Sequence, residues 1–96
     1  MKIDFIKEEG KLTVLLDGRL DTTTAPQLES FIAENLSNQT ELVIDCEKLN
    51  YVSSAGLRVL LSTHKKTNGA LKLIKVCEIV MEVFDITGFT DVLTIE

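Results

Sequence analysis

The sequence is poor in the residues from which metal, redox and catalytic sites are commonly built. Its 96 residues contain no tryptophan, one histidine, His64, and two cysteines, Cys46 and Cys77, which form no C-x-x-C pair. One histidine and two separated cysteines are too few for a zinc or redox motif. We expect two buried structural thiols, and the sequence alone leaves a disulfide between them open. It predicts no metal site and no cofactor.

Basic charge and long apolar runs are also scarce. The chain has 10 Lys and Arg residues against 15 Asp and Glu residues, a net charge of -5, and no basic cluster larger than Lys65-Lys66. Because this charge repels a phosphate backbone, we expect no nucleic-acid partner. No apolar run approaches the roughly 20 residues of a membrane span. The charged start MKIDFIKEEG lacks the apolar region of a signal peptide, so we expect a cytoplasmic protein without membrane contact.

The composition fits one small folded domain. Hydrophobic residues make up 45% of the chain and charged residues 26%, with one proline and five glycines. This content supports a hydrophobic core and argues against long disordered stretches. We expect residues 1–96 to form a single domain.

Apolar alternation predicts an opening pair of strands. Residues 2–6 alternate polar and apolar side chains, and a turn is expected at residues 8–10. In the second strand, one face carries the apolar side chains Leu12, Val14 and Leu16. The chain is expected to leave this strand through residues 18–21.

Helical spacing predicts the first helix. Thr24 and Gln27 fit a capping box, and Pro26 is tolerated in a first turn. We therefore expect a helix over residues 25–37, ended by the polar stretch at 37–40.

The remaining patterns alternate between strands and helices. Apolar runs predict strands at 41–46 and 70–76, and helical spacing predicts helices from residue 57 to about 67 and from residue 79 to about 88, with a short last strand near 91–95. Strands joined through a helix should be parallel, whereas the opening hairpin is antiparallel. The predicted fold is α/β, with a mixed sheet and helices packed mainly on one face.

The segment VSSAGLRVLL, residues 52–61, is the candidate functional segment. A serine nucleophile needs a base within hydrogen-bond reach. His64 follows Ser54 by ten residues on the same predicted helix, which is about 15 Å along the axis. G-x-S-x-G is absent because Val52 stands at the first glycine position, and no phosphate-binding loop is present. From these absences we expect that the chain is not an enzyme.

Capping explains one hydroxyl of this segment and leaves its small residues unexplained. Ser53 or Ser54 is expected to accept a backbone hydrogen bond at the helix N-terminus. Glycine costs up to about 1 kcal/mol of helix propensity relative to alanine. Ala55 and Gly56 make sense if another protein approaches the backbone closely, so we expect them to provide clearance for a partner.

Three segments in register resemble one family. YVSSAGL at 51–57, after the strand sequence LVIDC, resembles the signature of STAS domains, specifically the bacterial anti-sigma factor antagonists. GRLD at 18–21 is similar to the family's G-x-L/I-D turn, and FDITGF at 84–89 to its C-terminal F-D-x-[ST]-G-[LF] segment. The resemblance covers nearly the whole chain and implies a STAS-like mixed sheet and a binding protein without catalytic residues.

The resemblance also implies a role for Ser54. In such families the equivalent serine is phosphorylated by a partner serine kinase that is also an anti-sigma factor, and a metal-dependent serine phosphatase removes the phosphate. The unphosphorylated antagonist binds the kinase and frees the sigma factor. The family often has Asp before this serine, whereas this chain has Ser53, which is the rival acceptor.

The expected partner surface surrounds Ser54. It comprises Asp21, Thr22, Ser53, Ser54, Ala55, Gly56 and Arg58. Asp21 is either an acidic surface residue beside Ser54 or a carboxylate that stabilises a turn or a helix cap, and the sequence leaves both roles open. Arg58, at i+4 from Ser54, is either a partner for phosphate or carboxylate or an ordinary solvated residue. We expect a monomer. The alternative function is an unphosphorylated STAS subunit of a larger assembly, such as a lipid-transport ABC complex.

Overall fold

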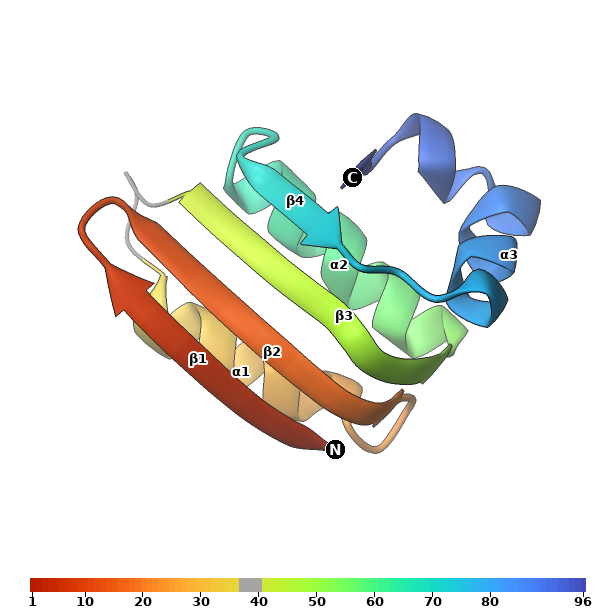
Figure 1. Ribbon diagram of the computed structural model, residues 1–96, viewed down its shortest axis with the longest axis horizontal. Coiled ribbons are helices and arrows are strands. Elements are labelled where there is room, and N and C mark those ends of the chain that lie inside the picture. Colours follow the sequence, from red (N-terminus) through yellow and green to blue (C-terminus); the bar gives the residue numbers. More distant parts are fainter. Residues whose placement is uncertain (37–40) are drawn as a thin grey trace.

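The computed structural model describes residues 1–36 and 41–96 as one mixed sheet with helices and short connections (Figure 1). The sheet order is β1-β2-β3-β4-β5; β1 is antiparallel to β2, and the other neighbouring strands are parallel. The elements are β1 (Lys2–Glu8), β2 (Lys11–Leu20), α1 (Ala25–Asn35), β3 (Glu41–Val52), α2 (Ser54–Lys66), β4 (Leu71–Ile74), α3 (Glu78–Thr87), a 3-10 turn (Phe89–Asp91) and β5 (Thr94–Ile95). This confirms the predicted order, the antiparallel hairpin and the mixed sheet.

The two central strands extend further than the sequence predicts. The expected exit from β2 at residues 18–21 is wrong, because Arg19 still pairs with Tyr51 and Leu20 with Val52. The strand expected at 41–46 likewise continues to Val52. Between Leu15 and Asp17, and again between Gly18 and Arg19, the register of β2 against β3 shifts. These long strands carry the end of β2 alongside the end of β3.

The boundaries of the first helix and the fourth strand also differ from the prediction. The capping box is wrong, because Thr24 has a helical backbone (φ -97°, ψ -21°) and its side chain makes no cap hydrogen bond. The helix ends at Asn35, and the break expected at 37–40 lies outside the described residues. The strand expected at 70–76 is shortened to four residues, and Lys75 after it takes a left-handed φ of 56°.

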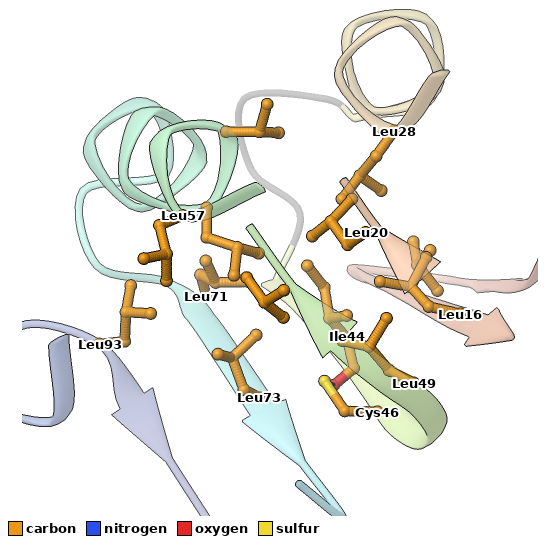
Figure 2. Close-up of a cluster of buried hydrophobic side chains, with 14 of the residues drawn as sticks. Leu16, Leu20, Leu28, Ile44, Cys46, Leu49, Leu57, Leu71, Leu73 and Leu93 are labelled. Atoms are coloured by element: carbon orange, nitrogen blue, oxygen red, sulfur yellow. The ribbon is translucent and has the colours of Figure 1, made fainter. Parts of the chain in front are cut away.

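The core lies between the sheet and helices α1 and α2, which cover one of its faces (Figure 1). Leu12, Val14 and Leu16 are buried, as their alternation predicts. Figure 2 shows Leu28 of α1 and Leu57 of α2 directed toward the strands. Because two of the three helices of the described residues cover one face, the prediction of helices packed mainly on one face is confirmed. The third helix, α3, lies beside β3 (Figure 1).

Only some of the apolar side chains whose spacing predicts α3 are buried in the core. Val80 and Phe84 are fully buried, whereas Ile79 is 64% exposed. Gly88 ends the helix in the left-handed conformation, with φ 78°, as its position predicts. In the described residues, no helix combines the length and hydrophobicity needed to cross a bilayer.

Both cysteines carry free thiols. Cys46 is buried in the core, as expected, and this burial raises the pKa of its thiol to about 12, with smaller contributions from Asp45 and Cys77. Cys77 is half-buried just before α3, and its thiol lies 3.4 Å from the carbonyl oxygen of Leu49. The disulfide that the sequence left open is not formed. Because the buried Cys46 thiol is held in its neutral form, it is a poor nucleophile.

Candidate functional site

The ends of β2 and β3 bring two distant segments together. Leu20 is paired with Val52, and the N–H of Ser53 donates a 2.9 Å hydrogen bond to the carbonyl oxygen of Leu20. Asp21 and Ser53 therefore begin neighbouring loops at the same end of the sheet. Just before them, the guanidinium carbon of Arg19 lies 4.0 Å from the centre of the Tyr51 ring. Two of the three motif segments thus meet in space, as a shared site requires.

The two serines have different positions. Ser53 is the N-cap of α2, with an extended backbone (φ -94°, ψ 175°), and its Oγ accepts a 3.3 Å hydrogen bond from the N–H of Gly56. Ser54 is the first residue of the helix, and it is exposed. The positive end of the helix dipole lies at this terminus, so added negative charge at Ser54 is locally favourable. The cap uses the hydroxyl of Ser53, whereas no hydrogen bond within residues 1–36 and 41–96 involves the hydroxyl of Ser54.

Gly56 is required by a contact inside the chain. The residue is buried, and a Cβ atom added there would lie 2.8 Å from Leu20 Cγ and 2.9 Å from the Leu20 carbonyl oxygen. These distances are shorter than a carbon atom tolerates. Packing of α2 against the end of β2, rather than clearance for a partner, therefore accounts for glycine at this position. Ala55, beside it, is half-buried and remains available to a partner.

Asp21 organises the loop that enters α1. Its carboxylate accepts hydrogen bonds from the N–H groups of Thr24 (3.1 Å) and Thr23 (3.0 Å), and it lies 3.7 Å from the guanidinium of Arg19. The backbone hydrogen bond from Thr24 is the largest of the influences that together lower the pKa of Asp21. In turn, Thr24 Oγ1 donates to the Arg19 carbonyl oxygen and accepts from the Asp21 N–H. This supports the turn-carboxylate interpretation, while the loop still lies beside Ser53.

Replacing Asp21 with Asn is expected to remove an acid-sensitive part of the stability. Because folding lowers the pKa of Asp21, its stabilisation is present above the ordinary pKa of 3.8 and is lost as pH falls through the folded-state pKa. Below about pH 4, the free energy of unfolding should therefore fall more steeply for the wild type than for Asp21→Asn. Urea denaturation followed by circular dichroism measures both slopes. Asp85→Asn, at an exposed carboxylate of α3, is the control; equal slopes for wild type and Asp21→Asn would contradict the expectation.

A groove between α1 and α2 continues from these loops. It has a volume of about 360 Å³ and is lined by Thr22, Ala25, Pro26, Glu29, Ala55, Arg58, Val59 and Ser62. Three of the residues expected to bind a partner, Thr22, Ala55 and Arg58, therefore line one surface. Arg58 is exposed, and no carboxylate of the described residues lies within 4.0 Å of it. It is free to pair with a group from outside.

The sequence analysis missed the α1 wall of this groove. Pro26 and Glu29 lie three positions apart and hence on one side of α1, a signal that spacing alone contains. What spacing does not contain is that this side faces α2. The third motif segment, by contrast, is structural, since Phe84 fills the core and Gly88 ends α3.

The described residues contain no arrangement for nucleophilic or metal chemistry at this site. Ser54 and His64 are separated by ten residues of the same helix, about 15 Å along its axis. The buried His64 Nδ1 has no hydrogen-bond partner among the described residues, so it takes part in no catalytic relay there. No group of three metal-ligating side chains occurs in residues 1–36 and 41–96. What the site presents is an exposed hydroxyl, a helix N-terminus and a groove.

Comparison with known proteins gives consistent results. The STAS domain model matches residues 2–96. The chain is 35% identical to BtrV of Bordetella bronchiseptica over 96 residues (96% of this chain, 83% of BtrV), and 31% identical over 98 residues to the anti-sigma-B factor antagonist of Bacillus subtilis (99% of this chain, 90% of that protein). Among solved structures, an anti-sigma factor antagonist from Mycobacterium paratuberculosis superposes with a TM-score of 0.85 at 23% identity, covering 98% of this chain and 83% of that one. The unphosphorylated anti-sigma factor antagonist SpoIIAA gives 0.82 at 16% identity, covering 99% and 88%.

Proposed function

Because this chain belongs to the STAS domain family, we propose that it acts as an anti-sigma factor antagonist controlled by phosphorylation of Ser54. It works by binding and has no catalytic residues of its own. Unphosphorylated, it binds a serine kinase that is also an anti-sigma factor, so that the sigma factor is released. The kinase transfers the γ-phosphoryl group of ATP to Ser54 Oγ, with release of ADP and the hydroxyl proton. A metal-dependent serine phosphatase hydrolyses the phosphate and restores the binding form.

The observation that carries this proposal is the difference between the two serines. The Ser53 hydroxyl accepts from the Gly56 N–H, so modifying it would disturb the helix cap. The Ser54 hydroxyl is exposed on the first turn of the same helix. A kinase reaches Ser54 without opening the fold, and the helix terminus tolerates the phosphate that results.

The groove gives the partner a surface next to the modified residue. Thr22 and Ala55 lie along it, Arg58 contributes a cation with no ion pair in the described part of the chain, and Glu29 contributes an anion on the other helix. A kinase that places its active site over Ser54 would contact these helices at the same time. Phosphorylation then adds about -1.5 to -2 charge units beside that surface, on a chain whose net charge is already -5. Docking is expected to fail at the interface, while the fold remains intact.

The first test is the position of the phosphate. The chain is incubated with ATP and a candidate serine kinase of the anti-sigma factor type from the same organism, and the product is analysed by peptide mass spectrometry. One phosphate on Ser54 is expected, because this residue is exposed. Ser54→Ala should accept none.

Ser53→Ala is the matched control for this experiment. It should still be phosphorylated, but it loses the cap hydrogen bond and about 1 kcal/mol of stability. Phosphate on Ser53, or an unmodified chain beside a kinase that is active on another substrate, would contradict the proposal. Copurification with transporter subunits instead of a kinase would support the alternative of a structural STAS subunit.

A further inference from the structure

The strand β1 forms an open edge of the sheet. Among the described residues it pairs only with β2, so one row of its backbone N–H and C=O groups has no strand partner. Two of its large apolar side chains are also exposed, Phe5 at 49% and Ile6 at 54%. The opposite edge strand, β5, has only two residues. An open edge with apolar side chains on both faces is a template for another strand.

A second copy of β1 fits this edge in one full-length register. A two-fold axis perpendicular to the sheet makes the two β1 strands antiparallel and leaves the helices of both copies on the same side. Residues of β1 on the helix-covered face, which are Ile3, Phe5 and Lys7, must then lie opposite residues on the same face of the second copy. With Phe5 opposite Phe5 of the second copy, the sequence KIDFIKE overlaps over its whole length. Lys2 then opposes Glu8 of the second copy, and this pair occurs twice by symmetry.

The neighbouring registers that match the faces bring carboxylates together. A shift of two residues in one direction places Asp4 opposite Asp4 of the second copy. A shift of two in the other direction places Asp4 opposite Glu8 of the second copy, twice. Because like charges directly opposite each other are destabilising, the charge order of β1 favours the register centred on Phe5.

The centred register also continues the charge pattern of the existing sheet. Within one chain, Lys2 lies opposite Asp17 of β2, and Glu8 lies opposite Lys11. Joining the edges therefore gives the row Asp17, Lys2, then Glu8 and Lys11 of the second copy, in which the sign alternates at every step. Lys2 also lies 3.8 Å from Asp4 of its own strand, but both side chains are largely exposed, so this pair holds Lys2 only weakly.

Aromatic packing supports the same join. The Phe5 ring lies 5.1 Å from the ring of Phe31 on α1, at an angle of 56°. In the centred register the two Phe5 rings are opposite each other, so both Phe5–Phe31 pairs lie over the joined edge and the exposed half of Phe5 is covered. We propose that two copies of this chain form a symmetric dimer through antiparallel pairing of β1, centred on Phe5. This proposal differs from the monomer expected from the sequence.

Charge reversal at the two ends of β1 tests the proposal, since Lys2 and Glu8 are both exposed. Sedimentation equilibrium of the purified chain, up to about 1 mM, is expected to show a monomer–dimer equilibrium. Lys2→Glu alone and Glu8→Lys alone each place like charges at both ends of the paired strands. Each should weaken self-association by about tenfold or more. An equimolar mixture of the two variants restores opposite charges at both ends and should form a heterodimer with near wild-type affinity.

Lys7→Glu is the matched control, because it makes the same charge change on the same strand, where Ile3 of the second copy lies opposite. Its dimerisation constant should stay within about twofold of the wild-type value. A wild-type chain that remains monomeric up to about 1 mM would overturn the proposal. So would a dimer that both single variants leave unchanged, or a mixture of the variants that does not associate.

Discussion

Ser54→Asp is expected to weaken binding to the partner kinase about a thousandfold, which corresponds to about 4 kcal/mol. The side chain is exposed on the first turn of α2, beside the groove that carries Arg58 and Glu29. A fixed charge there must be desolvated or must face partner carboxylates, and like-charge contacts across an interface cost several kcal/mol. Isothermal titration calorimetry with the kinase and a nucleotide measures the loss. Ser54→Ala should bind like the unphosphorylated wild type and should not respond to ATP.

Two controls separate an effect at the interface from an effect on the fold. Ser30→Asp adds the same charge at an exposed position of α1 that does not line the groove, and it should bind normally. The stability of Ser54→Asp should equal or slightly exceed that of the wild type, because an anion is favourable at a helix N-terminus. If Ser54→Asp binds as tightly as Ser54→Ala, the proposed control by charge at this interface is wrong.

The order of elements could be predicted from the sequence because each one carries its own pattern. Leu12, Val14 and Leu16 alternate and are buried on one face, and Gly88 ends α3 with a positive φ. Predictions failed where a distant segment decides the conformation. Thr24 looks like a cap in sequence, yet its hydroxyl donates to the carbonyl oxygen of Arg19, which belongs to the preceding strand. That partner depends on where β2 ends, and pairing with β3 sets the end of β2.

The candidate site shows the same division. The sequence identified Ser53 and Ser54 and expected one to cap the helix, which is a local property of the segment. The groove requires α1 and α2 to lie side by side, and of the residues that line it the sequence had singled out only Thr22, Ala55 and Arg58. Gly56 was recognised as unusual for the correct local reason, its low helix propensity, but its neighbour is Leu20, 36 positions earlier in the chain. No pattern around Gly56 specifies that contact.

Gly56→Ala is expected to destabilise the protein by about 1–3 kcal/mol, and Gly56→Val by more. In an exposed helix the alanine substitution would stabilise by up to about 1 kcal/mol, so the sign of the change is diagnostic. Here the new Cβ would lie 2.8 Å from Leu20 Cγ and 2.9 Å from the Leu20 carbonyl oxygen. That oxygen already accepts the hydrogen bond from the Ser53 N–H, so the start of α2 must move away from β2. Urea denaturation measures the stability, and slower phosphorylation of Ser54 would report the displaced helix terminus.

The double variant Leu20→Ala, Gly56→Ala identifies which of the two contacts is responsible. Leu20→Ala alone should cost about 2–5 kcal/mol, because its side chain is fully buried. It also removes the Cγ and Cδ2 atoms that the new Cβ would meet, so the double variant should be less destabilised than the sum of the single ones. The carbonyl oxygen remains in place, and the relief should therefore be partial. Full additivity would assign the cost of Gly56→Ala to the carbonyl oxygen alone. If Gly56→Ala instead stabilised the chain, α2 would shift without cost, and the close approach of Leu20 would not fix the position of Ser54.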